Sequence, residues 1–190
     1  RNARLMKLNL QLEQTQRTLN QSNEHLNQLA MHDSLTGIYN RRAAMPLVNE
    51  AIKKVQSCTA RYALMLIDVD RFKAVNDKYG HAVGDEVLMI LSQRISALLR
   101  NGDVFARWGG EEFILVFPET PADGGFTICN RLRENIEKHK FDFKGESLSV
   151  TMTIGLSEYR GSEQMADTIK RADIALYQGK KSGKNCVVTN

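Results

Sequence analysis

Acidic residues at two places along the chain have the types and spacing of a metal-binding site. Asp68 and Asp70 end the apolar run 62–67, and alternation along a strand places residues two apart on the same face. Glu111 and Glu112 precede a second apolar run. If the two runs form neighbouring strands, Asp68 and Glu111 converge, and converging carboxylates repel one another unless a cation lies between them. Mg²⁺ prefers oxygen ligands that carboxylates and phosphates supply jointly. Helix capping, or a solvated strand end paired with lysines, would explain the same spacing.

A glycine pair and three lysines indicate what such a site could bind. Consecutive glycines at 109–110, at the tip of a hairpin, let a phosphate or a planar group approach the backbone closely, although an ordinary tight turn explains the pair equally well. Lys73, Lys180 and Lys184 could contact a triphosphate, but lysines are also common on solvated surfaces. The combination of acids, glycines and lysines with the polar segment 76–85 favours a nucleotide site more than any one of these features does.

Strand and helix patterns surround these residues. The run 62–67 is typical of a buried central strand, and Asn40 can cap a helix that runs to Gln56, with Pro46 delaying its start or bending it. The remaining pattern predicts strands at 104–108, 112–117, 148–157 and 186–189 and helices at 85–99, 123–140 and 165–182. The order β-α-β-β-α-β, followed by α-β, predicts an α+β fold with a ferredoxin-like, antiparallel-containing sheet and flanking helices.

The first thirty residues differ from the rest, because they contain no glycine, proline or aromatic residue. Leucines recur there every seven residues, as in a coiled coil: Leu5, Leu12, Leu19 and Leu26. Small or polar residues would share the core in either register, Thr15 and Ser22 in one and Asn9, Gln16 and Asn23 in the other. A single helix lying against its own domain is the alternative, but the narrow apolar stripe favours a parallel two-stranded coil. We expect an amphipathic linker helix at 1–30 that forms a homodimer, and one domain at 31–190.

Composition excludes several classes of protein. The 190 residues carry a formal net charge of +4, too small an excess for a dedicated nucleic-acid binder. Scattered Cys58, Cys129 and Cys186 are typical of free thiols in a reducing compartment. No run approaches the roughly 18 apolar residues of a membrane span, and no secretory signal is visible. We expect a cytoplasmic location for this segment, an upstream sensor module and no nucleic-acid partner, whether or not the complete protein is tethered to a membrane.

Five motifs in unbroken order resemble those of one known family. Residues 107–113, Arg-Trp-Gly-Gly-Glu-Glu-Phe, resemble the signature loop of GGDEF domains, in its GGEEF form. The other four motifs are Asp-Ser-Leu-Thr-Gly-Ile-Tyr-Asn-Arg-Arg at 33–42, Asp-Val-Asp-Arg-Phe-Lys at 68–73 with Asn-Asp at 76–77, Gly-His-x-x-Gly-Asp at 80–85, and Arg-Ala-Asp at 171–173 continuing through Tyr177 to Lys180. The resemblance covers about residues 31–189, and five spaced motifs in register make coincidence a negligible explanation.

The resemblance implies a diguanylate cyclase, which condenses two GTP into cyclic di-GMP with loss of two pyrophosphates, on a fold similar to the palm of polymerases. One such domain holds one GTP, so two domains must meet face to face, and the helix at 1–30 would raise the effective concentration of the second half-site. The alternative within the family is a catalytically silent receptor of GTP or cyclic di-GMP, although degenerate loops mark that class and this loop is intact. A third alternative, an interaction or nucleic-acid module, lacks the aromatic platform expected on its sheet.

Carried over position by position, the resemblance gives four residues catalytic and metal-binding roles. Asp68, the Val69 carbonyl and Glu111 would hold Mg²⁺, with Mn²⁺ as an alternative ion. Glu112 would help to hold a second metal ion or to activate the attacking 3′-hydroxyl. Metal ions and lysines would then stabilise the negative charge that builds on phosphate oxygens.

The resemblance also implies which residues bind the substrate. Two would read the guanine edge by hydrogen bonds: Asn76 and Asp85. Five would meet the phosphates, through backbone amides or lysine side chains: Arg71, Phe72, Lys73, Lys180 and Lys184. Two would leave room for the base and the α-phosphate: Gly109 and Gly110. Many members of the family have arginine at position 184. The lysine here therefore replaces a planar guanidinium with several hydrogen-bond donors by a compact ammonium group.

A second binding feature lies upstream of the loop. Arg100 and Asp103 form an RxxD motif, which in the family is the allosteric product-inhibition site, with a helper arginine that falls on Arg131. Arginine can grip guanine or phosphate with two hydrogen bonds, and aspartate can accept one from the guanine amino group. A simple turn that closes a helix is the alternative, because the intervening Asn-Gly is strong turn chemistry.

Overall fold

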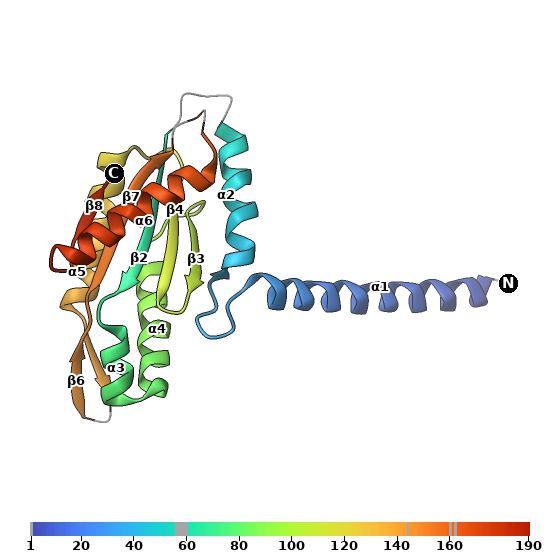
Figure 1. Ribbon diagram of the computed structural model, residues 1–190. Coiled ribbons are helices and arrows are strands. Elements are labelled where there is room, and N and C mark those ends of the chain that lie inside the picture. The colour runs from blue at the N-terminus through green and yellow to red at the C-terminus, as the bar shows by residue number, and fades with distance from the viewer. Residues whose placement is uncertain (1, 56–60, 144, 160, 162) are drawn as a thin grey trace.

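The computed structural model describes residues 2–55, 61–143, 145–159, 161 and 163–190 (Figure 1). The helices are α1 (Asn2–Met31), α2 (Arg41–Val55), α3 (Phe72–Tyr79), α4 (His81–Ser96), α5 (Ala122–Lys138) and α6 (Met165–Lys181). The strands are β1 (Tyr39–Asn40), β2 (Tyr62–Val69), β3 (Val104–Gly109), β4 (Glu112–Phe117), β5 (Lys140–Phe143), β6 (Glu146–Ser149), β7 (Met152–Tyr159) and β8 (Val187–Thr189).

One mixed sheet organises the molecule, in the strand order β1-β3-β4-β2-β7-β8. β2 lies in its middle, pairs antiparallel with β4 and β7, and is buried along its whole length, as its continuous apolar sequence predicts. β3 and β4 form a hairpin, and the short β1 and β8 add parallel edges. The succession β2-α4-β3-β4-α5-β7, followed by α6 and β8, confirms the predicted α+β fold with flanking helices.

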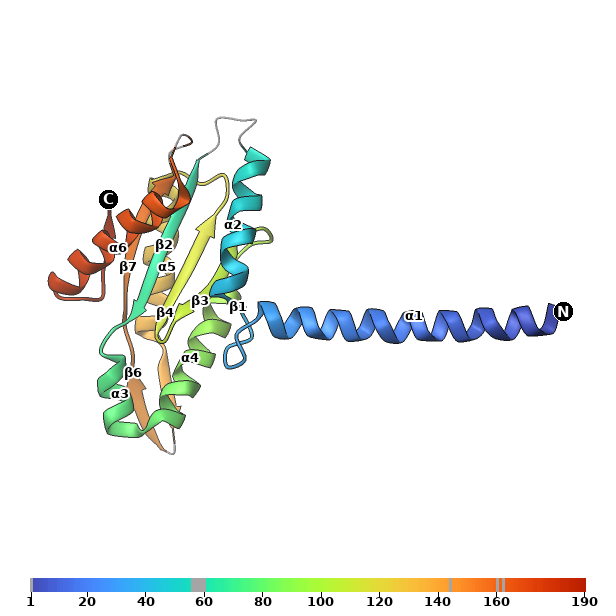
Figure 2. The same cartoon turned by 45° about the vertical axis from the view of Figure 1, so that its right-hand side comes forward.

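Alternate residues of β2 point into two hydrophobic cores on opposite faces of the sheet. Met65 and Ile67 belong to the core that includes α4 and α5, whereas Leu64 and Leu66 belong to the core that includes α2 and α6. Figure 1 shows α6 crossing one face of the sheet, and the turned view in Figure 2 shows α2 beside β3. Because both faces are packed, the carboxyl end of β2 is a rigid place on which to build a site.

The long helix α1 extends away from the sheet (Figure 1, Figure 2). Of the heptad leucines, Leu12, Leu19 and Leu26 are 63%, 58% and 61% exposed, so the alternative of a helix lying against its own domain is wrong. The end of α1 is tied to the domain by Asn40, whose Nδ2 donates to the backbone oxygen of Ala30 at 2.9 Å. No helix in the described part of the chain is both long and apolar enough to cross a membrane.

Several predicted boundaries around α2, α3 and α4 are corrected by the structure. Asn40 caps α2 through a 3.0 Å bond from the amide of Ala43, and Pro46 lies inside the helix without delaying its start; the predicted end at Gln56, like Cys58, falls outside the described residues. The segment before residue 85 is helical, because it contains α3 and the first turn of α4. Gly80 separates these two helices, and its φ of 87° interrupts the helical backbone. α4 ends at Ser96 rather than at 99.

The hairpin of β5 and β6 is a second departure from the prediction. α5 ends at Lys138 instead of 140, and the residues that follow pair with part of the predicted strand 148–157, which starts only at Met152. The hairpin escapes prediction because its alternation covers four residues per strand, with Phe141 and Phe143 buried. Cys129 and Cys186 are free thiols, as predicted.

Candidate active site

Antiparallel pairing of β2 with β4 brings the predicted acids to one end of the sheet. Asp68 is the register partner of Glu112, and the amide of Val69 donates to the backbone oxygen of Glu111 at 3.2 Å. Asp68 and Glu111 therefore converge, as expected if the two apolar runs are neighbours. Asp68 is nearly buried at 7% exposed, while Glu111 and Glu112 are half-buried.

Lys180 on α6 provides the positive charge nearest to these acids. Its Nζ lies 2.6 Å from Oδ2 of Asp68. Burial raises the pKa of Asp68 above its ordinary value, Lys180 acts in the opposite direction, and the charge of Asp70 raises it further. The pKa of Glu111 is also raised, first by burial and then by the charge of Asp68. Burial thus disfavours the charged forms of both carboxylates.

The raised pKa values of Asp68 and Glu111 bear on whether these residues fit a metal ion. Among the described residues, no three His, Cys, Asp or Glu side chains form a ready metal cluster. However, two carboxylates whose charged forms are disfavoured, sharing one ammonium beside the Val69 backbone, are a set of hard oxygen donors that a divalent cation would stabilise. These residues fit Mg²⁺, with further ligands left to water and phosphate.

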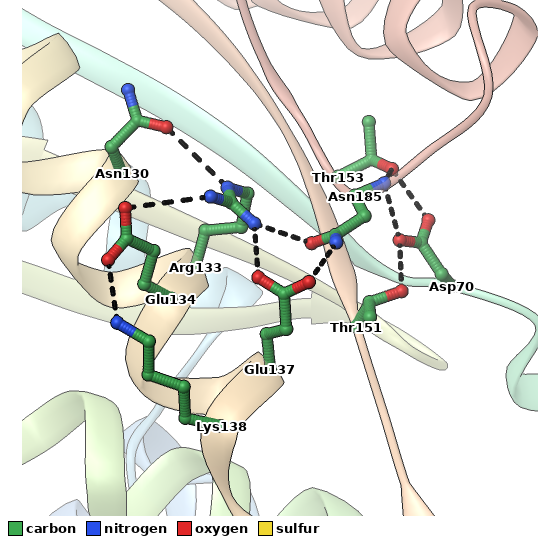
Figure 3. Close-up of polar contacts among 9 residues, drawn as sticks. All are labelled: Asp70, Asn130, Arg133, Glu134, Glu137, Lys138, Thr151, Thr153 and Asn185. Atoms are coloured by element: carbon green, nitrogen blue, oxygen red, sulfur yellow. Dashed lines mark hydrogen bonds and ion pairs between the residues drawn. The ribbon is translucent and has the colours of Figure 1, made fainter.

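Asp70 belongs to a different set of contacts from Asp68. It lies beyond the end of β2, and its oxygens accept from the hydroxyls of Thr151 at 2.8 Å and Thr153 at 2.6 Å and from the amide of Asn185 at 2.9 Å (Figure 3). Strand alternation therefore does not make Asp70 a second free acid beside Asp68.

The N-terminal end of α3 lies two residues after Asp70 in the chain. Arg71 has a left-handed φ of 56°, and no side chain caps the helix. Its carbonyl accepts from the amides of Ala74 and Val75, which leaves those of Phe72 and Lys73 as the helix-end donors without intrahelical acceptors. Phe72 is buried, and the Lys73 side chain is exposed. This end of α3 can bind phosphate oxygens through its backbone.

Asn76 occupies a tight place between α3 and α4. A Cβ on Gly84 would come within 1.9 Å of Asn76 Oδ1, so glycine is required there for the two helices to approach. Oδ1 is buried and has no hydrogen-bond partner within the described residues. A buried acceptor without a donor is costly and is the kind of group that a ligand satisfies. Asp85 lies exposed, one residue beyond Gly84.

The glycine loop between β3 and β4 is open on its outer side. Among the described residues, a Cβ on Gly110 would meet no atom within 4 Å, and one on Gly109 would meet Glu112 Oε2 at 3.9 Å. The register shifts between Arg107 and Gly109, so the hairpin has a bulge instead of a plain two-residue turn. Bulky groups can approach the backbone here.

Arg107 and Asp33 are functional candidates to which sequence analysis assigns no role, although both lie inside quoted motifs. The Arg107 guanidinium contacts Asp33 at 3.0 Å and the backbone oxygen of Gly110 at 2.8 and 2.9 Å. Asp33 also accepts two hydrogen bonds from Thr36. The glycine loop is thereby tied to the turn that follows α1.

The RxxD segment lies away from the acids and is held by its own contacts. Asp103, whose side chain is 3% exposed, accepts from the Arg100 amide at 2.9 Å and from its Nε at 3.2 Å. Arg100 Nη2 also donates to the Pro118 carbonyl and to Thr120. The predicted turn is present, since the Asp103 amide donates to the Arg100 carbonyl. Arg131 is exposed on α5.

Comparison with known proteins shows the family of this chain. The family described as "Diguanylate cyclase, GGDEF domain" matches residues 30–186. The chain is 38% identical over 165 residues to diguanylate cyclase DgcM of Escherichia coli and 36% identical over 168 residues to the response regulator PleD of Caulobacter vibrioides. Each match covers 87% of this chain but only 40% and 37% of those proteins, so the chain spans about two fifths of their length.

Solved structures extend the similarity to three dimensions. The coiled coil and GGDEF domain of DgcB from Caulobacter crescentus, in complex with c-di-GMP, matches with a TM-score of 0.86 and 27% identity, covering 96% of this chain and 99% of that one. The active GGEEF domain of a diguanylate cyclase from Vibrio cholerae matches with a TM-score of 0.73 and 30% identity, covering 79% and 96%. Since the family match covers most of the chain and the fold agrees, the chain belongs to the GGDEF domain family of diguanylate cyclases.

Proposed function

We propose that this chain is an active diguanylate cyclase that condenses two GTP into cyclic di-GMP with release of two pyrophosphates. The observation that carries the proposal is the convergence of Asp68 and Glu111 at the end of the sheet, with Lys180 2.6 Å from Asp68. Relatives that are named diguanylate cyclases support it, as does the similarity to a GGEEF domain described as active. The loop at 109–113 is of the same GGEEF form.

In this proposal Asp68, the Val69 carbonyl and Glu111 hold Mg²⁺, for which Mn²⁺ can substitute. The ion, when bound, stabilises negative charge on the phosphate oxygens and on the attacking oxygen. Glu112, half-buried beside Glu111, takes part in holding a second ion or accepts the proton of the attacking 3′-hydroxyl. Lys180, whose Nζ lies 2.6 Å from Asp68 Oδ2, would bind a phosphate oxygen of the substrate.

The remaining residues bind and orient GTP. Asn76, with its unmet buried acceptor, and Asp85 accept hydrogen bonds from the N–H groups of guanine. The helix-end amides of Phe72 and Lys73, with the Lys73 and Lys184 side chains, bind the triphosphate. Orientation of the α-phosphorus toward a 3′-oxygen supplies much of the rate enhancement.

One domain holds one GTP, and the product requires two attacks, so the reaction takes place between two domains. We propose that residues 1–30 form the dimerising helix and residues 31–190 the catalytic domain. The exposed leucines of α1 and the similarity to a coiled coil and GGDEF domain support a parallel coil as the dimer contact. An upstream sensor module remains a prediction.

Product inhibition is a further part of the proposal. Arg100, Asp103 and Arg131 would bind cyclic di-GMP, with Asp103 holding the Arg100 guanidinium in place. The structural neighbour from Caulobacter crescentus is itself in complex with c-di-GMP.

The test is turnover by the purified chain. Incubation with GTP and Mg²⁺ is expected to give one cyclic di-GMP for every two pyrophosphates, measured by chromatography and by a pyrophosphate assay. Glu111→Gln removes one charge at nearly constant volume and is expected to reduce the rate by about 10²-fold or more. Glu50→Gln, the same change at an exposed position of α2, is the matched control. Equal rates for Glu111→Gln and the unmodified chain would refute the proposed metal site.

A further inference from the structure

The loop between α6 and β8 places Lys184 beside the candidate site in an unusual backbone conformation. Lys184 and the following Asn185 have φ values of 68° and 49°, in the left-handed region that residues with side chains rarely adopt. Two such residues in succession persist only where their surroundings hold them. The contacts that hold this loop therefore decide where Lys184 lies.

On one side the backbone of the loop is clamped by Asp70. The Asn185 amide donates to Oδ2 of Asp70 at 2.9 Å and lies 3.1 Å from Oγ1 of Thr153. The Lys184 amide donates to the carbonyl of Gly179 at 3.0 Å. Asp70 is 5% exposed and is itself fixed by threonine hydroxyls of the β7 region (Figure 3). The carboxylate two residues after Asp68 thus anchors the loop.

On the other side the Asn185 side chain is clamped by α5. Arg133 Nη1 donates to Oδ1 of Asn185 at 2.8 Å, and Nδ2 of Asn185 donates to Oε1 of Glu137 at 2.7 Å. Arg133 Nη1 also lies 2.8 Å from Oε2 of Glu137, which closes a triangle of three residues (Figure 3). Both ends of the amide are bonded, so its orientation is determined. The Arg133 side chain is only 14% exposed.

The contacts of this loop determine where the backbone of Lys184 lies. Lys184 and Asn185 line a cavity of about 430 Å³ together with Asp70 and Arg71. The cavity that Lys184 lines thus reaches Arg71, which directly precedes the N-terminal end of α3. Lysine has a flexible stem and no planar fork, so its direction has to come from the backbone that bears it.

We propose that Arg133, Glu137 and Asn185 are positioning residues, which hold the loop so that Lys184 presents its ammonium group to the triphosphate of the bound nucleotide. They act through Lys184, whose loop Asp70 holds from the other side. The inference rests on the proposed function, because the triphosphate is that of GTP. A helix on the far side of β7 from α6 thereby contributes to substrate affinity.

The test measures binding of 3′-deoxy-GTP with Mg²⁺ by calorimetry, because a nucleotide without the 3′-hydroxyl cannot condense. Arg133→Gln is expected to weaken binding about five- to tenfold. Arg133→Lys keeps the charge but cannot reach both partners, and is expected to recover part of the loss. Lys138→Met is the matched control, since it removes an ion pair with Glu134 on the same helix without contact to Asn185.

A double-mutant cycle separates positioning from a general loss of structure. In a Lys184→Met background, Arg133→Gln is expected to cause no further loss of affinity, because the group through which it acts is gone. An equal loss in both backgrounds, or no loss in the unmodified background, would overturn the proposal. Glu137→Gln is expected to repeat the pattern of Arg133→Gln.

Cyclic di-GMP formation by the unmodified chain tests the proposed function separately. A non-additive binding cycle in a chain that makes no cyclic di-GMP would support the positioning role and contradict the cyclase. An additive cycle in an active enzyme would do the reverse. A chain that neither binds 3′-deoxy-GTP nor forms cyclic di-GMP would overturn both.

Discussion

Arg107 donates hydrogen bonds to both carboxylate oxygens of Asp33, at 3.0 and 3.2 Å, although 74 positions separate the two residues. The side chains are 18% and 20% exposed, so water weakens this ion pair only in part. The other nitrogens of the same guanidinium hold the Gly110 carbonyl. One side chain therefore joins the turn at the base of α1 to the glycine loop.

Arg107→Met is expected to reduce cyclic di-GMP formation more than it reduces stability. The change removes the hydrogen bonds to the Gly110 carbonyl and leaves Asp33 with its contacts to Thr36. We therefore expect the conformation of the glycine loop to change more than the stability of the domain. We expect a loss of about tenfold or more in kcat and of roughly 1–3 kcal/mol in the free energy of unfolding. Initial rates and thermal unfolding measure the two effects.

Arg94 provides the control for this substitution. It is a half-buried arginine that donates two hydrogen bonds to Asn135, between α4 and α5 and away from the glycine loop. Arg94→Met is expected to cost comparable stability with little change in kcat. Similar loss of kcat in both variants would mean that Arg107 acts only through stability.

The Asp33 carboxyl predicts a pH dependence of stability. Burial raises its pKa, but hydrogen bonds from Thr36 and Arg107 outweigh burial, and the net pKa lies below the ordinary 3.8. The folded state therefore binds this proton less readily than the unfolded state. The stabilisation is present above pH 3.8 and is lost as the pH falls through the lower folded value. Asp33→Asn is expected to make the melting temperature depend less on pH below pH 4 than it does in the unmodified chain. An identical dependence on pH in both would contradict the assignment.

Elements with a strong local pattern could be predicted from the sequence, and short ones could not. β2 and β4 bury continuous apolar runs, so their existence follows from residue type alone. α3 has only eight residues and a polar sequence, and β5 buries only Phe141 and Phe143. Such segments depend on the neighbours that cover them, which sequence patterns do not reveal.

Part of the candidate site could likewise be predicted from the sequence, and part of it could not. The acids and glycines lie in local motifs, and pairing of two predicted strands is enough to bring Asp68 to Glu111. The bond from Thr153 to Asp70 spans 83 positions and that from Arg133 to Asn185 spans 52. Nothing in the spacing of these residues indicates their contact, because it depends on how α5 and the last loop pack against the finished sheet.

Packing of α6 against β7 leads to a prediction on Gly155. A Cβ at this position would lie 2.0 Å from the Ala172 carbonyl oxygen and 2.4 Å from the Leu176 nitrogen, both backbone atoms of α6. The helix would have to move as a whole, so Gly155→Ala is expected to cost at least about 3 kcal/mol. In a domain of this size that lowers the melting temperature by roughly 6–12 °C. Gly161→Ala is the control, because a Cβ there would meet no atom of the described residues within 4 Å, and it is expected to change the melting temperature little.

Product inhibition is expected to depend on Arg100 with little effect on the initial rate. Arg100→Ala removes the proposed ligand-binding guanidinium, and we expect the concentration of cyclic di-GMP that halves the rate to rise at least about tenfold. Asp103→Ala should relieve inhibition as well, but at a cost in stability, because Asp103 is buried and bonds the Arg100 amide. Inhibition curves that overlay for the unmodified chain and Arg100→Ala would refute the site.

The exposed leucine stripe of α1 predicts that dimerisation controls activity. Leu12, Leu19 and Leu26 lie seven residues apart and are all more than half exposed, so replacing the three by serine removes the proposed coiled-coil contact without disturbing the domain. Light scattering is expected to show a monomer at micromolar concentration. Activity per chain should fall at least about tenfold and rise with protein concentration, since the second half-site is no longer tethered. Leu10→Ser, at an equally exposed position outside the heptad, should leave both readouts unchanged. A triple variant that stays dimeric and fully active would assign dimerisation to another surface.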